Sequence, residues 1–418
     1  MLKWLARWKY RIMFFFSIVG PGFITANVDN DANGITTYSQ AGAQFGYTLL
    51  WTMIPVTIAL IVIQEMSARM GAATGKGLSD LIREEFGIRP TFLVMLALVI
   101  VNFGNIIGEF SGIALSLQLL SVPKWISVPV CAALVWMLVV KGNYKSVEKI
   151  FLIASFFYIA YIVAGLIAQP DWQRAALATF IPPKFGELKN SAYLFMVVSI
   201  VGTTIAPWMQ FYLQSSIVEK GVTKEQYGLS RLDVIVGCVF TDVVAWFIIV
   251  ACAATLYAVG HKNIDNATDA AYALRPLAGK YAYLLFAAGF FNASLFAASI
   301  LPLSTAYSVC EGMGFESGVE RKFSEAREFY WLYTGLLVAG TITVLRIPNE
   351  RLIHFQILSQ FVNGALLPVI LIFMLLLINK RELMGEYVNS RLFNVIAWAT
   401  TIVVILLSIA VPFMQRAP

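Results

Sequence analysis

Apolar residues form long runs along this chain, and short polar segments separate the runs. A helix needs about 20 apolar residues to cross the hydrocarbon core of a bilayer. Because a backbone inside lipid must satisfy its own hydrogen bonds, each run predicts a spanning helix. The eleven predicted spans cover residues 12–45, 47–70, 91–120, 124–140, 146–168, 192–218, 231–259, 281–311, 328–346, 352–379 and 392–414. The pattern therefore predicts an all-α integral membrane protein.

The composition supports this interpretation. Of the 418 residues, 59% are hydrophobic and 13% are charged, whereas a soluble domain has about 25% charged residues. The longest polar stretches, residues 75–90, 169–189 and 260–280, have the size of loops. We therefore expect residues 1–418 to form one transmembrane domain in a lipid bilayer, and we expect a monomer.

Basic residues alternate between the two sides of the predicted spans. The N-terminus and the even-numbered loops carry 20 of the 30 Lys and Arg residues. By the positive-inside rule, this places the N-terminus in the cytoplasm and, after eleven spans, the C-terminus outside the cell membrane. The net charge of +6 thus reflects topology, and we expect no nucleic-acid partner.

The residues that commonly carry catalysis are scarce. There are four cysteines without a C-x-x-C pair, and the two histidines, His261 and His354, lie far apart. The sequence contains no G-x-S-x-G motif, and no histidine cluster that would bind zinc or iron. We therefore expect neither an enzyme nor a bound cofactor.

The first span contains residues that a membrane helix normally excludes. Gly20–Gly22 predicts a kink, and Asn27–Gly34 contains two carboxylates and three amides. Asp, Asn and Gly form helices poorly, so we expect this segment to unwind. Unwound carbonyls, half-helix ends and a carboxylate can together bind a cation. The alternative is an external loop between two shorter helices.

The sixth span has a matching interruption at Thr203–Gln210. Pro207 lies near the middle of the span, where it removes a backbone hydrogen bond and frees a carbonyl one turn earlier. Such a proline can be a simple kink. However, this one comes five spans after the first break, and inverted-repeat transporters have interruptions at corresponding places. We predict repeats at about 12–168 and 192–379, followed by an additional helix at 392–414.

Further polar side chains lie inside predicted spans. Glu109 is deep in the third span, and an intramembrane carboxylate suggests a functional site, although a protonated Glu bonded within the bundle is an equal alternative. Gln360 and Asn363 are three residues apart, on one helix face. Hydrogen bonding between helices is the better interpretation of Asn363. Asp242 stays unassigned.

Several segments resemble the NRAMP family of divalent-metal transporters. Gly20–Phe23, followed after 17 residues by Ala41–Tyr47, is similar to the first span of that family without a gap. Further similarity lies at Glu109–Leu120, Asp269–Gly279 and Glu311–Gly312, and also at Ser359–Gln360. The resemblance implies a LeuT-type fold, with a 5+5 inverted repeat, broken helices 1 and 6, and an eleventh helix.

The chain also departs from the family pattern. The resemblance implies that the metal-binding Asp is Asp31, whereas the coordinating Asn falls on Gly34, with Asn33 one position away. When the proline of the sixth span is aligned, the metal-binding Met of the family falls on Ala206. A second alignment, with one residue inserted near Trp208, does not clearly retain a thioether at this position either. The two histidines of the sixth span appear as Met209 and Gln214, and the Asp of the third span as Ile106.

These departures favour a hard cation. A thioether selects transition metals, whereas Mg²⁺ keeps several waters and suits a roomier, oxygen-lined site. The chain resembles the NRAMP-related magnesium transporter branch. We predict Mg²⁺ uptake, with Mn²⁺ also accepted, by alternating access and without proton coupling. The expected metal site comprises Asp31, Ala32, Asn33, Gly34, Ala206 and Gln360; Glu109, Trp208, Met209 and Asn363 are secondary candidates.

Two other functions stay open at this stage. One is a proton-coupled Mn²⁺/Fe²⁺ importer of the same architecture. The other is an amino-acid or amine symporter of this fold, in which a carboxylate at the break would hold an ammonium group. Both share the predicted broken helices, so the sequence does not separate them from magnesium uptake.

Overall fold

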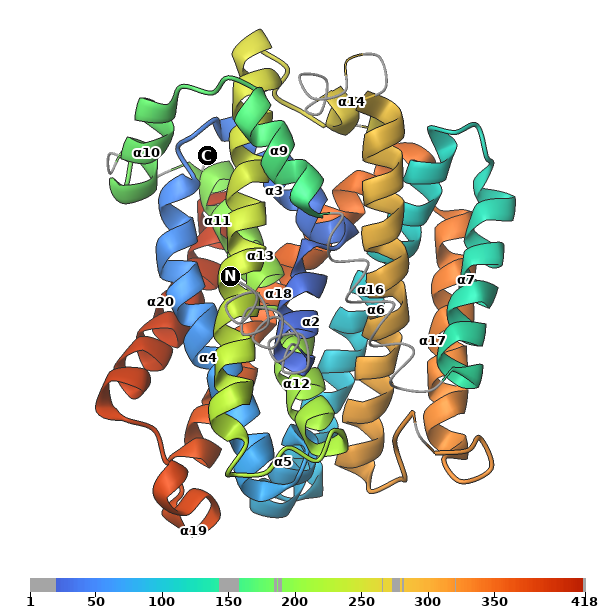
Figure 1. The fold of residues 1–418 in the computed structure, drawn as a ribbon, viewed down its shortest axis with the longest axis vertical. Coiled ribbons are helices and arrows are strands. Elements are labelled where there is room, and N and C mark those ends of the chain that lie inside the picture. The colour runs from blue at the N-terminus through green and yellow to red at the C-terminus, as the bar shows by residue number, and fades with distance from the viewer. Residues whose placement is uncertain are drawn as a thin grey trace, which may run out of the picture.

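The computed structural model of the chain describes residues 20–142, 158–183, 186, 190–264, 266–272, 279, 282–319 and 321–415. Every regular element within these ranges is a helix (Figure 1). Nine of these helices are long and apolar enough to cross a membrane. They correspond to nine of the eleven predicted spans. The all-α membrane fold is therefore confirmed.

The long helices follow the apolar runs closely. Their bounds are α4 (Met53–Thr74), α6 (Ile88–Gln118), α7 (Lys124–Lys141), α11 (Ser191–Thr204), α12 (Pro207–Glu219), α13 (Tyr227–Thr255), α16 (Ala282–Met313), α17 (Arg327–Arg346), α18 (Asn349–Ile378) and α20 (Arg391–Gln415). Shorter elements connect them: η2 (Leu50–Thr52), α5 (Leu78–Phe86), α10 (Trp172–Phe180), η5 (Tyr257–Val259), α14 (Ala267–Tyr272), α19 (Arg381–Met384) and η7 (Gly385–Tyr387).

The two remaining predicted spans are described only in part. The first begins at Gly20 and is divided into α2 (Pro21–Asn27), η1 (Val28–Asn30) and α3 (Ala32–Phe45). Residues 12–19 of this span, like the basic N-terminus, lie outside the described residues. Of the fifth predicted span, the structure describes α9 (Ile159–Ile167), whereas residues 146–157 lie outside it.

The divided first span lies at the centre of the bundle (Figure 1). Both of its halves pack along α13, and α3 also contacts α6, α11 and α18. Small residues allow the close approach to α13: a Cβ on Gly42 would lie 2.4 Å from the carbonyl oxygen of Ile249, and one on Gly237 would lie 2.7 Å from the Cα of Phe23. The polar residues of the first span are therefore placed in the interior.

The outer helices expose apolar side chains. In α20, exposed residues recur along one face: Leu392, Val395, Ile402, Leu406 and Ile409 are each more than half exposed. In Figure 1, α20 lies at one edge of the bundle, and α7 and α17 lie at the other. An apolar outer face of this extent is typical of helices that face hydrocarbon.

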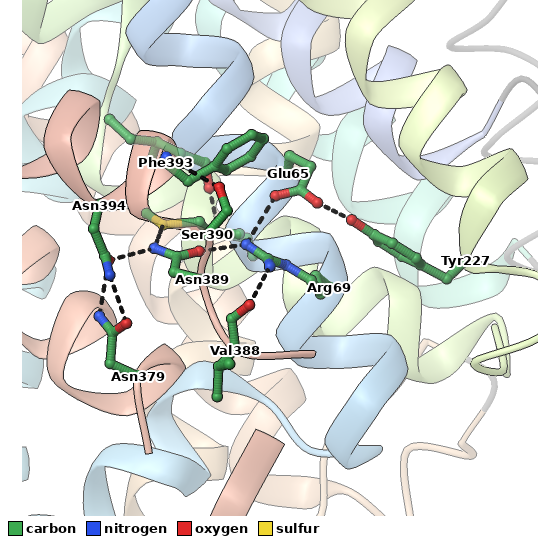
Figure 2. A network of polar contacts seen from close by, with 12 residues as sticks. Glu65, Arg69, Tyr227, Asn379, Val388, Asn389, Ser390, Phe393 and Asn394 are labelled. Carbon is green, nitrogen blue, oxygen red and sulfur yellow. Dashed lines mark hydrogen bonds and ion pairs between the residues drawn. The ribbon is translucent and has the colours of Figure 1, made fainter. Parts of the chain in front are cut away.

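A buried polar network lies where α4 approaches the segment that joins η7 to α20 (Figure 2). We call Glu65, Arg69, Tyr227, Val388 and Asn389 the α4 network. Arg69 pairs with Glu65, with 3.1 Å between Nη2 and Oε2. Its guanidinium also donates to the Val388 carbonyl, at 3.1 Å, and to the Asn389 side chain. Tyr227 of α13 donates to the other oxygen of Glu65. The network thereby ties three distant segments together.

Candidate cation site at two broken helices

The break in the first span is short. The α-helix ends at Asn27, a single 3-10 turn follows over Val28–Asn30, and Asp31 is extended, with φ −70° and ψ −174°. The predicted unwinding over Asn27–Gly34 is thus limited to one turn and one residue. Asp31 caps α3, because its Oδ1 accepts the N–H of Gly34 at 2.6 Å. A carboxylate at this position also faces the positive end of the helix dipole.

The second break lies between α11 and α12. Ile205 and Ala206 are not helical, and α12 begins at Pro207. Since proline has no N–H, the carbonyl of Thr203 loses the donor that a continuous helix would provide. The Ala206 carbonyl, which we had expected to bind the metal, instead accepts the N–H of Met209 at 3.1 Å. Thr203 therefore carries the carbonyl that the proline leaves without its helical partner.

The two breaks meet inside the bundle. The hydroxyls of Tyr38 in α3 and Thr204 in α11 lie 2.7 Å apart. A Cβ on Gly34 would lie 3.3 Å from the Thr203 hydroxyl and only 2.1 Å from the Asp29 carbonyl. Gly34 is therefore the residue that lets the 3-10 turn fold against the start of α3.

Glu109 of α6 lies directly beside this junction. Its side chain is fully buried, and it accepts the N–H of Ala32 at 3.2 Å and the side-chain amide of Asn33. The amide oxygen of Asn33 faces α6, since a Cβ on Gly108 would lie 1.8 Å from it. Asn33, which we had expected to bind the metal, is thus directed at α6 in this structure.

Gln360 belongs to an amide cluster between α6 and α18. Its Nε2 donates to Asn105 at 3.1 Å, and its Oε1 accepts from Asn363 at 2.8 Å. Asn363 also exchanges hydrogen bonds with Asn105, at 2.9 and 3.1 Å. Asn363 therefore makes the bonds between helices that its position favoured. Gln360 is held against α6, one turn from Glu109.

The other secondary candidates lie on the first turn of α12. Trp208 and Met209 are both buried. The Trp208 carbonyl accepts a hydrogen bond from the Ser304 hydroxyl at 3.3 Å, and the ring centroids of Trp208 and Tyr212 lie 6.1 Å apart. The structure therefore brings Asp31, Gly34 and Glu109 together, while Trp208 and Met209 face packed neighbours beyond the second break.

The sequence interpretation missed several residues of this region. Asn105 lies four residues before Glu109, so its place on the same face of α6 could have been recognised. Tyr158 is buried near Asp31 and Glu109, and no described residue accepts from its hydroxyl. No local signal in the sequence connects Tyr158 to the first span, because that contact depends on the tertiary packing.

The donors at the junction are oxygen atoms. They are the carboxylates of Asp31 and Glu109 and the hydroxyls of Tyr38, Thr203 and Thr204. Oxygen donors of this kind suit hard cations. Within the described ranges, no three His, Cys, Asp or Glu side chains gather as a metal-binding group. A cavity of about 300 Å³ lies between α3, α11 and α18, lined in part by Gln40, Met196 and Ile357.

The chain matches known proteins over most of its length. Residues 22–413 match the family model described as natural resistance-associated macrophage protein-like. The divalent metal cation transporter MntH of Deinococcus radiodurans is 28% identical over 405 residues, which cover 93% of this chain and 88% of that protein. The protein of the same name from Klebsiella pneumoniae is 27% identical and covers 94% and 92%.

Solved structures share the fold. The manganese transporter of Eremococcus coleocola has a TM-score of 0.75 at 20% identity and covers 96% of this chain and 87% of its own. MhsT, solved in complex with L-phenylalanine, has a TM-score of 0.63 at 12% identity, and the match covers 94% of this chain and 98% of that chain. At these identities, the likeness concerns the fold alone. The predicted LeuT-type fold is confirmed.

Proposed function

Because this chain belongs to the natural resistance-associated macrophage protein (Nramp) family, we propose that it is a secondary transporter that carries divalent metal cations into the cell by alternating access. The curated relatives are named as divalent metal cation transporters, not as enzymes. We further propose that Mg²⁺ is the main substrate, that Mn²⁺ is also accepted, and that the chain belongs to the magnesium transporter branch of the family.

One observation carries this proposal: the Asp31 carboxylate lies where two broken helices meet, among oxygen donors. Asp31 is 7% exposed, the Glu109 carboxylate is bonded to the two residues that follow Asp31, and the Thr203 hydroxyl lies close to Gly34. Mg²⁺ prefers oxygen ligands and usually keeps part of its water shell, so it needs few direct protein ligands. Ala206, at the second break, offers no thioether that would favour a transition metal.

The side-chain amides of Asn33 and Gln360 already have hydrogen-bond partners, which limits direct contact with a metal ion. Both amides are bonded to neighbours on α6 or α18 in this structure. We propose that they act on the bound ion through its waters, or after these bonds exchange during the transport cycle. Asp31 is then the one firm anionic ligand, and the Thr203 carbonyl replaces that of Ala206 in the expected set.

The residues at the family's proton-path positions support uptake without proton coupling. Gln214 donates its amide to the Lys76 carbonyl at 2.8 Å, and Ile106 is buried and apolar. Neither side chain can carry a proton. An inside-negative potential of 100 mV supplies about 4.6 kcal/mol for a divalent ion. The membrane potential alone can therefore drive the uptake of a divalent ion without a proton gradient.

We also propose an orientation, with the N-terminus in the cytoplasm and the C-terminus outside. In Figure 1, α5, α19 and the connection from α12 to α13 lie at one end of the bundle. These segments, together with the residues between α4 and α5, carry Lys76, Arg83, Lys220, Lys224 and Arg381. By the positive-inside rule, this end faces the cytoplasm. We propose a single transmembrane domain that functions as a monomer.

A flux measurement tests the function. Proteoliposomes with an inside-negative potential would receive Mg²⁺ or Mn²⁺ while internal metal and internal pH are recorded together. We expect saturable uptake of both ions without acidification, and no saturable uptake by Asp31→Ala. The matched control is Asp171→Ala, which removes another helix-capping carboxylate at a surface loop and should transport normally.

The same measurement separates the alternatives. Acidification that accompanies Mn²⁺ uptake would establish the proton-coupled importer and overturn the uncoupled mechanism. Unchanged uptake by Asp31→Ala would remove Asp31 from the site. Uptake of an amine or amino acid without metal uptake would replace the metal proposal with the symporter.

A further inference from the structure

A second pair of buried aspartates lies on the other side of the first break. Asp29 belongs to η1 and is 2% exposed, and Asp242 belongs to α13 and is 4% exposed. Asn30, the residue after Asp29, hydrogen-bonds to Thr241, the residue before Asp242, so η1 packs against α13 at this pair. Asp31 faces Glu109 on α6, whereas Asp29 and Asp242 lie between the first span and α13. The transport of one ion at Asp31 does not use this pair.

The oxygens of this pair lack donors. Neither carboxylate oxygen of Asp242 has a hydrogen-bond partner among the described residues, and the same holds for Oδ1 of Asp29. Oδ2 of Asp29 accepts from the Tyr38 hydroxyl at 3.1 Å. Thr57 lies near Asp242, but its hydroxyl donates to the Met53 carbonyl at 2.6 Å. Three of the four carboxylate oxygens are therefore available to a ligand.

Asn30 adds an independent acceptor at the same place. Its Nδ2 donates to the carbonyl and the hydroxyl of Thr241, at 3.0 and 2.6 Å. These bonds hold the amide next to Asp242, while its Oδ1 is fully buried and lacks a partner within the described ranges. A buried acceptor without a donor is costly. Here, several such acceptors come together from two elements.

We propose that Asp29, Asp242 and the amide oxygen of Asn30 form a second site, which binds a hard divalent cation. The donors are all oxygen atoms, and this favours Mg²⁺ or Mn²⁺ bound with part of its water over a softer metal. One divalent ion balances the charge of both carboxylates, whereas a monovalent ion leaves one buried charge uncompensated. The bound ion links η1 to α13 and so holds the first break in place.

The number of bound ions tests this proposal. Purified full-length protein would be titrated with Mn²⁺ in detergent, with free Mn²⁺ measured by electron paramagnetic resonance. We expect two Mn²⁺ per chain, both displaced by Mg²⁺. Asp242→Asn should bind one, and Asp31→Ala should also bind one. Because the two variants remove different ions, a failure at Asp31 would affect the proposed function and leave this inference intact.

A buried aspartate on the same helix provides a matched control. Asp233 accepts the backbone N–H groups of Gly20, Gly22 and Phe23, so Asp233→Asn should still bind two Mn²⁺. Each variant is compared after gel filtration; if Asp242→Asn does not fold, Asp29→Asn replaces it.

Three results would overturn the second site. One is the binding of a single Mn²⁺ by the unmodified chain, which would mean that Asp29 and Asp242 are protonated and bind no ion. Another is two Mn²⁺ bound by Asp242→Asn. The third is displacement of the second ion by NaCl but not by choline chloride at equal ionic strength, which would indicate a sodium site.

Discussion

The α4 network and the first break are both buried and polar, but only the α4 network pairs its acidic residue with a basic one. In the α4 network, the Glu65 carboxylate and the Arg69 guanidinium lie 3.1 Å apart. Tyr227 donates to the carboxylate, and the guanidinium donates to Val388 and Asn389. At the first break, Asp29, Asp31, Glu109 and Asp242 are all acidic, and no described Lys or Arg forms an ion pair with them. The carboxylate of the α4 network already has a cationic partner, whereas the carboxyl groups of the break have no described Lys or Arg partner and, when ionised, offer a charge that a divalent cation can neutralise.

The hydrogen bonds of the break emphasise this difference. Asp31 and Glu109 accept from backbone N–H groups at the start of α3 and from the Asn33 amide. Such donors stabilise a carboxylate without cancelling its charge. Carboxyl groups without a cationic partner inside a membrane bundle are typical of functional sites. We therefore expect the α4 network to stabilise the fold and the break to serve the proposed binding of a cation.

The largest loss of stability is expected from Arg69→Ala, because it leaves Glu65 charged and buried. Removal of one partner from a buried ion pair costs about 3–5 kcal/mol. Thermal or denaturant unfolding in detergent would measure it. The control is Arg83→Ala, which breaks a more exposed pair with Asp80 and should cost about 1 kcal/mol or less. Equal losses in the two variants would contradict a structural role for the α4 network.

A smaller loss of stability, together with a loss of transport, is expected from Gly34→Ala. The new Cβ would lie 2.1 Å from the Asp29 carbonyl, and overpacking of this kind costs about 1–3 kcal/mol. The matched control is Gly228→Ala in α13, where nothing lies within 4 Å of the added Cβ. There the helix should gain up to about 1 kcal/mol. Unfolding assays would show a lower stability for Gly34→Ala and a higher stability for Gly228→Ala, and flux assays would measure transport. A stabilised Gly34→Ala would contradict the close packing of the turn.

The smallest effect on stability is expected from Asp31→Asn. Asp and Asn cap helices about equally well, so the metal-free protein should change by less than about 0.5 kcal/mol. Uptake should nevertheless be lost, because the anionic ligand is gone. Unfolding without divalent ions, paired with flux, would measure both. Retained uptake, or a destabilisation as large as that of Arg69→Ala, would remove the contrast between the two regions.

The sequence predicted features that depend on local chemistry. Apolar runs predicted the spanning helices, and helix-breaking residues located both breaks; the choice of Asp31 rested on the family resemblance. Contacts between distant residues were not predictable in this way. Asn33 hydrogen-bonds to Glu109, which lies 76 residues later in the sequence, and Asn30 hydrogen-bonds to Thr241, which lies 211 residues later. The proline of the sixth span predicted a freed carbonyl one turn earlier, which is the carbonyl of Thr203. The sequence did not predict that the Ala206 carbonyl accepts the N–H of Met209.

The close approach of the Asp29 carbonyl to Gly34 also limits how this protein can diverge. By the family resemblance, position 34 would hold an asparagine, but the carbonyl occupies the space where any side chain would begin. An asparagine at position 34 therefore fits only if the turn before it also moves. The residue at this position and the path of the preceding turn are thus coupled, so that a change in one requires a change in the other.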